Sequence, residues 1–315
     1  MRILFMGTPQ FAAVCLERLI TERFELLGVV TQPDRPKGRG MTVQPCEVKC
    51  LALQNQLPVW QPERVATPEF LELFTQLQPD LVVVVAFGQK IPNEILYNPK
   101  YGCINVHGSL LPEYRGAAPI QWSILNGDAV TGVTTMYMDE GWDTGDLIYQ
   151  ETTPIDPDEN FACLYLRLAH LGADLLVKTI KDIEAGIAPR IPQDDSKATF
   201  APKLPDGIQK IDWNNSATKI HNLIRVLAPT PGGETNFQNE RLKIITTQIR
   251  ESEGIENASP GMIIKIIKNE GILVGTADYP LLITKLQPAG KKVMTANDYA
   301  NGRRLQPGMI FGEAL

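Results

Sequence analysis

The residue types best suited to chemistry lie in residues 103–146. A short apolar run ends in Asn105-Val106-His107, and a loop rich in glycine and aspartate carries Asp143. Amide and imidazolium groups can donate hydrogen bonds to a developing oxyanion, and a carboxylate can orient a histidine and assist proton transfer. Because catalytic groups are often carried by loops and strand ends, this stretch is the candidate site.

Asn105 and His107 stand two apart on a predicted strand, so their side chains point to the same face. A polar pair on a short apolar strand needs either hydrogen-bond partners or a function. His107 alone could be a structural histidine, but the whole constellation favours catalysis. The acidic loop 139–146 does not match the twelve-residue calcium pattern, so we expect one of its acids to orient His107.

The flanking elements predict how these groups are positioned. An apolar strand at 3–6, a helix at 11–20 and a strand at 26–31 form a βαβ opening, which predicts an α/β fold with a mostly parallel, Rossmann-like sheet. Residues 80–87 are typical of a central strand, and the strand 103–107 should lie beside it. Ligands of such sheets bind outside the carboxyl ends of the strands, where Phe87 and Gly88 follow. The single Gly7 does not make a dinucleotide motif.

Residues 33–45, PDRPKGRGMTVQP, form a long loop that carries Arg35, Lys37 and Arg39. Loops of this length are usually functional or disordered. We interpret it as a basic arm that contacts a phosphate or a polar substrate end, with a solvated flexible loop as the alternative. Cys46 and Cys50 lack a second pair, so packing is favoured over metal binding.

The chain divides into two predicted domains. A catalytic domain occupies 1–188, and an aperiodic segment at 189–210 that is rich in Pro, Asp, Lys and Gln is the predicted linker. Residues 211–315 contain several short strands separated by Gly, Pro and Asn turns, which is typical of a small β-barrel. Basic residues recur near its loops, among them Lys291, Lys292 and Arg303, so it could bind nucleic acid or be a purely structural cap.

Composition limits the class of protein. The net charge of −6 argues against a general nucleic-acid binder, but residues 206–315 carry +2 and residues 1–205 carry −8. Five cysteines, an odd number, argue against a disulfide framework and favour the cytoplasm. No run of 18 apolar residues is present, so we expect no membrane span.

Several motifs together resemble the formyltetrahydrofolate-dependent transformylase family, and within it the methionyl-tRNA formyltransferases. They are the opening MRILFMGTPQFA, then TQPDRPKGRG, VVVVAFGQKIP, GCINVHGSLLPEYRGAAPIQWSILNGD, MDEGWDTGD, APKL with KIDW, and LQPAGKK. The resemblance covers nearly the whole chain. It implies a Rossmann-like formyltransferase domain followed by an OB-like domain that supports tRNA.

The resemblance also implies roles for single residues. The catalytic trio would be Asn105, His107 and Asp143. The folate segment would be Ser109, Leu110, Leu111 and Pro112, near Phe87 and Gly88. The long loop would contact the tRNA acceptor end through Arg39, helped by Arg35 and Lys37, and Lys291, Lys292 and Arg303 would contribute from the second domain.

The implied reaction moves a formyl group from 10-formyltetrahydrofolate to the α-amine of methionyl-initiator-tRNA. The attacking amine belongs to the substrate, so the absence of Ser, Cys and Lys from the trio fits, and we expect neither a metal nor an oligomer. A formyltetrahydrofolate hydrolase-type enzyme remains the alternative. A glycinamide transformylase is disfavoured by length, and a non-catalytic RNA-binding relative is disfavoured because Asn105, His107 and Asp143 are all retained.

Overall fold

The computed structural model describes residues 1–37, 42–251 and 258–312. Within it the chain forms two compact units. The first comprises Met1–Pro119, Val130–Thr153 and Tyr165–Pro202, and the second comprises Ile120–Ala129, Pro154–Leu164 and Lys203–Leu315. The predicted boundaries at 188 and 210 stay predictions, and these units differ from them because residues 120–129 and 154–164 group with the later part of the chain.

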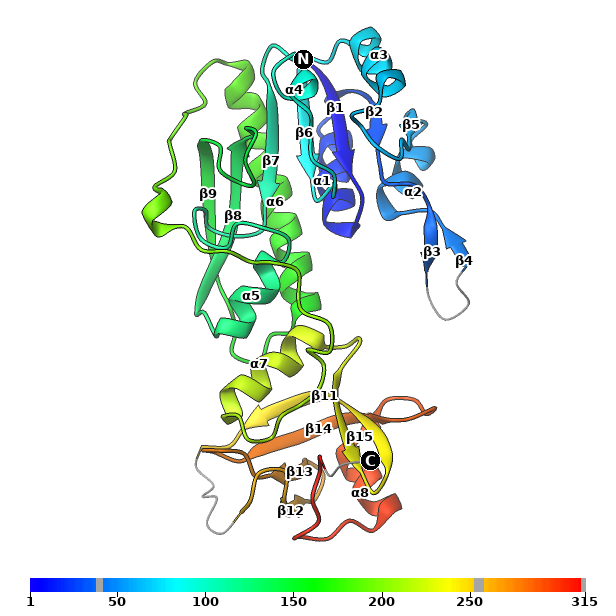
Figure 1. The fold of residues 1–315 in the computed structure, drawn as a ribbon, viewed down its shortest axis with the longest axis vertical. Coiled ribbons are helices and arrows are strands. Elements are labelled where there is room, and N and C mark those ends of the chain that lie inside the picture. The colour runs from blue at the N-terminus through cyan, green and yellow to red at the C-terminus, as the bar shows by residue number, and fades with distance from the viewer. Residues whose placement is uncertain (38–41, 252–257, 313–315) are drawn as a thin grey trace. The chain divides into compact units, whose positions relative to one another are not determined.

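The first unit is built on a seven-stranded sheet in the order β5-β2-β1-β6-β7-β8-β9 (Figure 1). Pairing is parallel from β5 through β7 and turns antiparallel between β7 and β8, which confirms the predicted α/β fold with a mostly parallel sheet. The strands are β1 (Arg2–Gly7), β2 (Glu25–Val30), β5 (Val59–Trp60), β6 (Leu81–Val85), β7 (Cys103–His107), β8 (Val130–Tyr137) and β9 (Leu147–Pro154).

Apolar side chains bury the central strands of this sheet. All five residues of β6 are buried, as expected for a central strand. One face packs against α3 (Pro68–Leu77) and α4 (Asn93–Leu96), whose Phe70, Phe74 and Ile95 join Leu4 and Val82 in one core cluster. The helices that follow in the chain are α5 (Pro119–Asn126) and α6 (Phe161–Glu184).

Helix α6 packs against both α1 (Gln10–Thr21) and β7, and its approach to β7 requires a small residue. The ring of Phe11 meets that of Tyr165 edge-on at 5.5 Å between centroids. A Cβ added at Gly172 would lie 2.9 Å from the Val106 side chain and 3.6 Å from the Phe11 ring. Gly172 therefore lets α6 approach β7, the strand that carries the candidate site residues.

The segment predicted as a long loop is partly ordered as a hairpin. β3 (Arg35–Lys37) pairs antiparallel with β4 (Thr42–Gln44), so the prediction of an irregular loop across 33–45 was wrong at these positions. The prolines and glycines of this segment concealed the pairing. The base of the hairpin is fixed where Lys49 of α2 (Glu47–Gln54) donates to Asp34 at 2.5 Å and to Gln61 at 2.6 Å. The hydrogen bond from Lys49 holds the pKa of Asp34 below its usual range.

The segment after α6 packs along the first unit. Ile191 pairs with Leu147 as an isolated bridge, and Phe200 pairs with Arg115. A short 3-10 turn, Asp195–Lys197, lies between them. We call residues 189–202 the strap. It falls within the predicted linker 189–210, yet its main chain is hydrogen-bonded to other segments of the first unit.

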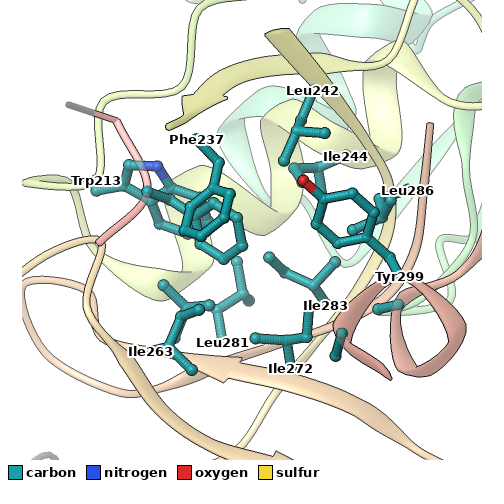
Figure 2. Packing of buried hydrophobic residues seen from close by; sticks show 14 of the residues in the cluster. Trp213, Phe237, Leu242, Ile244, Ile263, Ile272, Leu281, Ile283, Leu286 and Tyr299 are labelled. Carbon is teal, nitrogen blue, oxygen red and sulfur yellow. The ribbon is translucent and has the colours of Figure 1, made fainter. Parts of the chain in front are cut away.

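The second unit is organised around an antiparallel sheet in the order β10-β11-β14-β13-β12, with β15 beside β14. This is consistent with the predicted OB-like β-barrel domain. The elements are α7 (Ala217–Leu227), β10 (Gly233–Phe237), β11 (Glu240–Ile249), β12 (Ile263–Ile267), β13 (Gly271–Val274), β14 (Leu281–Pro288), β15 (Met294–Thr295) and α8 (Ala296–Arg303). Figure 2 shows its core, where Trp213 and Phe237 pack near Ile263 and Leu281.

Two buried polar side chains of α7 fasten residues 154–164 within the second unit. His221 is 5% exposed, and its Nε2 lies 3.0 Å from the carbonyl oxygen of Pro157. Because that oxygen only accepts, Nε2 carries the proton in the neutral ring, and Nδ1 accepts from the Thr247 hydroxyl at 2.9 Å. Arg225 donates to the carbonyls of Asp156 and Glu159.

Among the helices of the described residues, none is both long enough and apolar enough to cross a membrane.

The buried His221 predicts a pH-dependent stability. Burial lowers the pKa of His221 from 6.5, the hydrogen bond to the Pro157 carbonyl and the charge of Asp158 oppose this effect, and Arg225 adds to it. The unfolded chain therefore takes up a proton that the folded chain resists, and the free energy of unfolding should fall as the pH drops below 6.5. His221→Gln keeps a donor for Pro157 but does not titrate, so the free energy of unfolding of this variant should depend less on pH. Each tenfold difference in proton affinity between the folded and unfolded chains accounts for about 1.4 kcal/mol. Denaturant unfolding between about pH 7.5 and about pH 5.5 measures it, and identical slopes for both proteins would contradict it.

Candidate active site

The strand β7 places Asn105 and His107 at its carboxyl end. Asn105 is in register with Val84 on β6 and Met136 on β8, and His107 is opposite Thr134. Alternation along the strand directs both side chains to one face. Asn105 is half-buried, and its amide makes no hydrogen bond to the described part of the chain. The amide is therefore available to a ligand.

The imidazole of His107 lies between two acceptors. Its Nε2 is 2.9 Å from the carbonyl oxygen of Tyr114, and its Nδ1 is 3.7 Å from Oδ1 of Asp143. The ring is 6% exposed, so solvent screens these interactions little. A doubly protonated ring can donate towards both partners, whereas a neutral ring has one proton for the two. The structure thus brings His107 and Asp143 together, as the sequence predicted.

Asp143 occupies an unusual backbone conformation, with a φ of 56°. Its Oδ2 accepts a hydrogen bond of 2.8 Å from the main-chain N–H of Gly116. Its own carbonyl accepts one of 2.9 Å from Nε2 of Gln193. Non-glycine residues at positive φ are uncommon and persist where the surroundings hold them. Three segments, the loop after β8, the turn at Gly116 and the strap, thus meet at Asp143.

The other acids of this loop have structural partners. Asp139 accepts from the Gly141 amide and the Thr144 hydroxyl, Glu140 accepts from Asn93, and Asp146 lies 3.8 Å from Arg190. No group of three or more His, Cys, Asp or Glu side chains suited to a metal ion occurs among the residues that the structure describes. The expected absence of a metal stays a prediction.

The segment Ser109-Leu110-Leu111-Pro112 is held by one buried threonine. The Thr134 hydroxyl donates to the Ser109 carbonyl at 2.6 Å and accepts from the Leu111 amide at 3.1 Å. Gln150 donates to the Leu111 carbonyl at 2.8 Å and reaches the same hydroxyl at 3.2 Å. The Leu111–Pro112 bond is cis. This network fixes the segment directly beside the site.

The remaining predicted ligand residues differ in exposure. The Phe87 side chain is buried in the core cluster, and its carbonyl accepts from Thr8 and Gln32. Gly88 is exposed and has a φ of 85°, a conformation that favours glycine. Phe87 can therefore offer a ligand little more than its main chain, whereas Gly88 leaves room for one.

The predicted basic contacts lie in both units. Arg35 is exposed on β3, and Lys37 ends that strand. Arg39 lies outside the described residues. Lys291 and Lys292 are exposed in the turn before β15, and Arg303 ends α8, where it pairs with Glu240 and lies 5.9 Å from the centroid of the Tyr299 ring.

Sequence reasoning missed the residues that support the trio. Tyr114, Thr134 and Gln193 each hold a residue of the candidate trio or of the segment 109–112 in place, and the buried Arg115 donates to Gln193. Arg115, within YRGAAP, is a charged residue between apolar segments, and this pattern could have indicated that it is buried. Nothing in the sequence around Gln193 distinguishes it from a surface glutamine.

Comparison with known proteins finds matches over nearly the whole chain. Residues 1–180 match the family model described as formyl transferase, and residues 203–304 match that of the formyl transferase C-terminal domain. A protein of Thermodesulfovibrio yellowstonii named methionyl-tRNA formyltransferase is 47% identical over 98% of this chain and 97% of its own. One of the same name from Clostridioides difficile is 45% identical over 99% of this chain and 100% of its own.

A solved structure shares the fold at low identity. WlaRD, described as a sugar 3N-formyl transferase in the presence of dTDP and 5-N-formyl-THF, superimposes with a TM-score of 0.68. It is 21% identical, over 93% of this chain and 99% of its own. At this identity the likeness shows the fold alone.

The buried Thr134 hydroxyl gives a stability prediction. Thr134→Val keeps the shape of the side chain but leaves the Ser109 carbonyl and the Leu111 amide without their partner. Buried polar groups that lose a partner cost about 1–3 kcal/mol each, so we expect the free energy of unfolding to fall by at least about 1 kcal/mol. Thr75→Val removes an exposed hydroxyl on α3 and should change it by less than about 0.5 kcal/mol. Equal effects in denaturant unfolding would show that Thr134 does not hold the segment.

Proposed function

The chain belongs to the formyl transferase family, and from that membership we propose that it transfers the formyl group of 10-formyltetrahydrofolate to the α-amino group of methionyl-initiator-tRNA. The observation that carries the proposal is identity of 45–47% to methionyl-tRNA formyltransferases over nearly the full length of both chains. The product would serve translation initiation.

The geometry at the end of β7 supports roles for the trio. Attack of the substrate amine on the formyl carbon gives a tetrahedral intermediate with an oxyanion, which preorganised donors stabilise. The unengaged amide of Asn105 can donate to it. His107 can donate as well, provided that its hydrogen bond to the Tyr114 carbonyl is exchanged or shared when substrate binds. Asp143 orients the ring and accepts or relays the proton that leaves the amine, directly or through water. Collapse of the intermediate then breaks the bond between the formyl carbon and N10, and N10 takes up a proton as tetrahydrofolate leaves.

The folate would lie along residues 109–112 and Gly88. The Ser109 hydroxyl is engaged by the Glu113 carbonyl at 2.7 Å, and Leu111 is 2% exposed. Contact with the heterocycle therefore falls mainly to Leu110, Pro112 and Gly88, which are less buried. The neighbour WlaRD was solved with 5-N-formyl-THF present, which agrees with a folate co-substrate.

The nucleic-acid contacts are proposed from charge and from position in the chain. Arg35 and Lys37 lie on the hairpin of the first unit, with Arg39 following them in the chain. Lys291, Lys292 and Arg303 lie in the second unit. Phosphate groups attract such residues without sequence preference. We further propose that the protein acts as a monomer in the cytoplasm without a metal, where its charged tRNA substrate is available.

The hydrolase-type alternative uses the same trio on water instead of an amine. The relatives named above are called transferases, so the alternative gains no support from them.

Incubation with 10-formyltetrahydrofolate and charged initiator tRNA should yield formylmethionyl-tRNA, with little formate when the tRNA is omitted. Free methionine and uncharged tRNA are the controls, and formylation of free methionine at a similar rate would contradict dependence on tRNA.

Substitution of any one residue of the trio should remove most of the formylation activity. Asn105→Ala, His107→Ala and Asp143→Ala should each lower kcat/KM by about 10²–10³ or more, because each removes a donor or the group that orients one. Formylation assays with charged initiator tRNA measure this, and thermal unfolding checks that the fold is intact. His170→Ala changes an exposed histidine of α6 and should be fully active. Near-normal formylation by His107→Ala would overturn the proposed mechanism.

The basic turn before β15 predicts a salt-dependent effect. Lys291→Glu should raise the KM for charged tRNA several-fold, and it should reduce the slope of log KM against log salt by about one. The KM for the folate should not change. Lys268→Glu makes the same charge change at another exposed site of the second unit and serves as the control. Equal behaviour of the two variants would show that residue 291 makes no tRNA contact.

A further inference from the structure

We propose that Gln193, on the strap, is a positioning residue that holds the loop of Asp143 in its reactive geometry. Its amide nitrogen donates to two main-chain carbonyls of that loop, Asp143 at 2.9 Å and Gly145 at 2.8 Å. One side chain thus binds the main chain on both sides of Thr144. The inference rests on the proposed function, because it gives Gln193 a role through Asp143.

Gln193 is itself oriented by a buried charge. Its Oε1 accepts from Nε of Arg115 at 3.1 Å and from Nη2 at 2.8 Å. Arg115 is 5% exposed, and its second partner is the carboxylate of Asp195 at 2.7 Å. Because a guanidinium only donates, the oxygen of the Gln193 amide must face Arg115 and its nitrogen must face the loop. The arginine therefore sets which end of the glutamine meets the catalytic loop.

The arrangement constrains Asp143 from both sides. The Gly116 amide holds its carboxylate, and Gln193 holds its carbonyl. Gly116 follows Arg115 directly, so one turn of the chain supplies both the amide that binds the carboxylate and the arginine that orients Gln193. The positive φ of Asp143 needs such support, because a residue with a Cβ does not favour it.

The loop itself tolerates little movement. A Cβ added at Gly145 would lie only 2.0 Å from the carbonyl oxygen of Tyr137. Releasing Gln193 would free the Asp143 side of the loop while the Gly145 side remains packed. The carboxylate would then move relative to His107, and a displacement of about 1 Å can cost about 10²-fold in rate.

The experiment compares two substitutions of Gln193. Gln193→Ala removes both the contact with Arg115 and the contacts with the loop. Gln193→Glu keeps an oxygen acceptor for Arg115 but replaces the N–H donors with a second oxygen that faces two carbonyls. If Gln193 positions the loop, both variants should lose about 10- to 100-fold in kcat for formylation of charged initiator tRNA, with the KM for both substrates within about twofold.

Other results would separate the possible roles. If Gln193 merely satisfies the buried Arg115, Gln193→Glu will match the unsubstituted protein while Gln193→Ala loses thermal stability, and the proposal is overturned. Increases in KM with an unchanged kcat would overturn it as well. Gln76→Glu makes the same chemical change on the exposed face of α3 and should leave both constants unchanged. If the unsubstituted protein does not formylate charged tRNA, the proposed function fails instead.

Discussion

The geometry of the candidate site depends on holding a carboxylate of one loop against a histidine at the end of a strand. His107 and Asp143 are separated by 36 positions, and the sheet fixes only the first of them. The 2.8 Å hydrogen bond from the Gly116 amide to Asp143 joins the two segments. Tyr114, two residues earlier in that turn, also accepts from the His107 ring. The turn at 114–116 therefore sets the position of both members of the pair.

Buried polar groups surround the candidate site, and each of them has hydrogen-bond partners. A group such as the Thr134 hydroxyl or the Arg115 guanidinium is costly inside a protein unless it is paired. Thr134 joins residues 109–112 to the sheet, and Arg115 joins the turn to the strap. In each case the hydrogen bonds that offset the cost of burying the polar group also fix the position of the segment that it binds. Formyl transfer to an amine needs such rigidity, because donors set in advance lower the barrier without reorganising during reaction.

The sequence predicted the parts whose pattern is local. The uniformly apolar β6, the periodic α6 and the strand 103–107 with its polar end were all correctly predicted. The β3–β4 hairpin was missed because prolines and glycines conceal its alternation. The contacts of the strap, which falls within the predicted linker 189–210, were not predicted because they are long-range: Gln193 and Asp143 are 50 positions apart, and no periodicity links them.

The fold therefore explains less of the specificity than the segments attached to it. A sugar 3N-formyl transferase shares this fold at 21% identity, so the sheet alone does not determine which amine is formylated. What an amine acceptor requires of any such enzyme is a donor pair and a proton acceptor, and Asn105, His107 and Asp143 can supply these for a sugar or an aminoacyl group alike. Discrimination must then come from surfaces that reach beyond the reacting atoms. In this chain the basic strand β3 and the basic turn before β15 are suited to a phosphate backbone. Long-range charge attraction acts strongly on a polyanion and only weakly on a single amine.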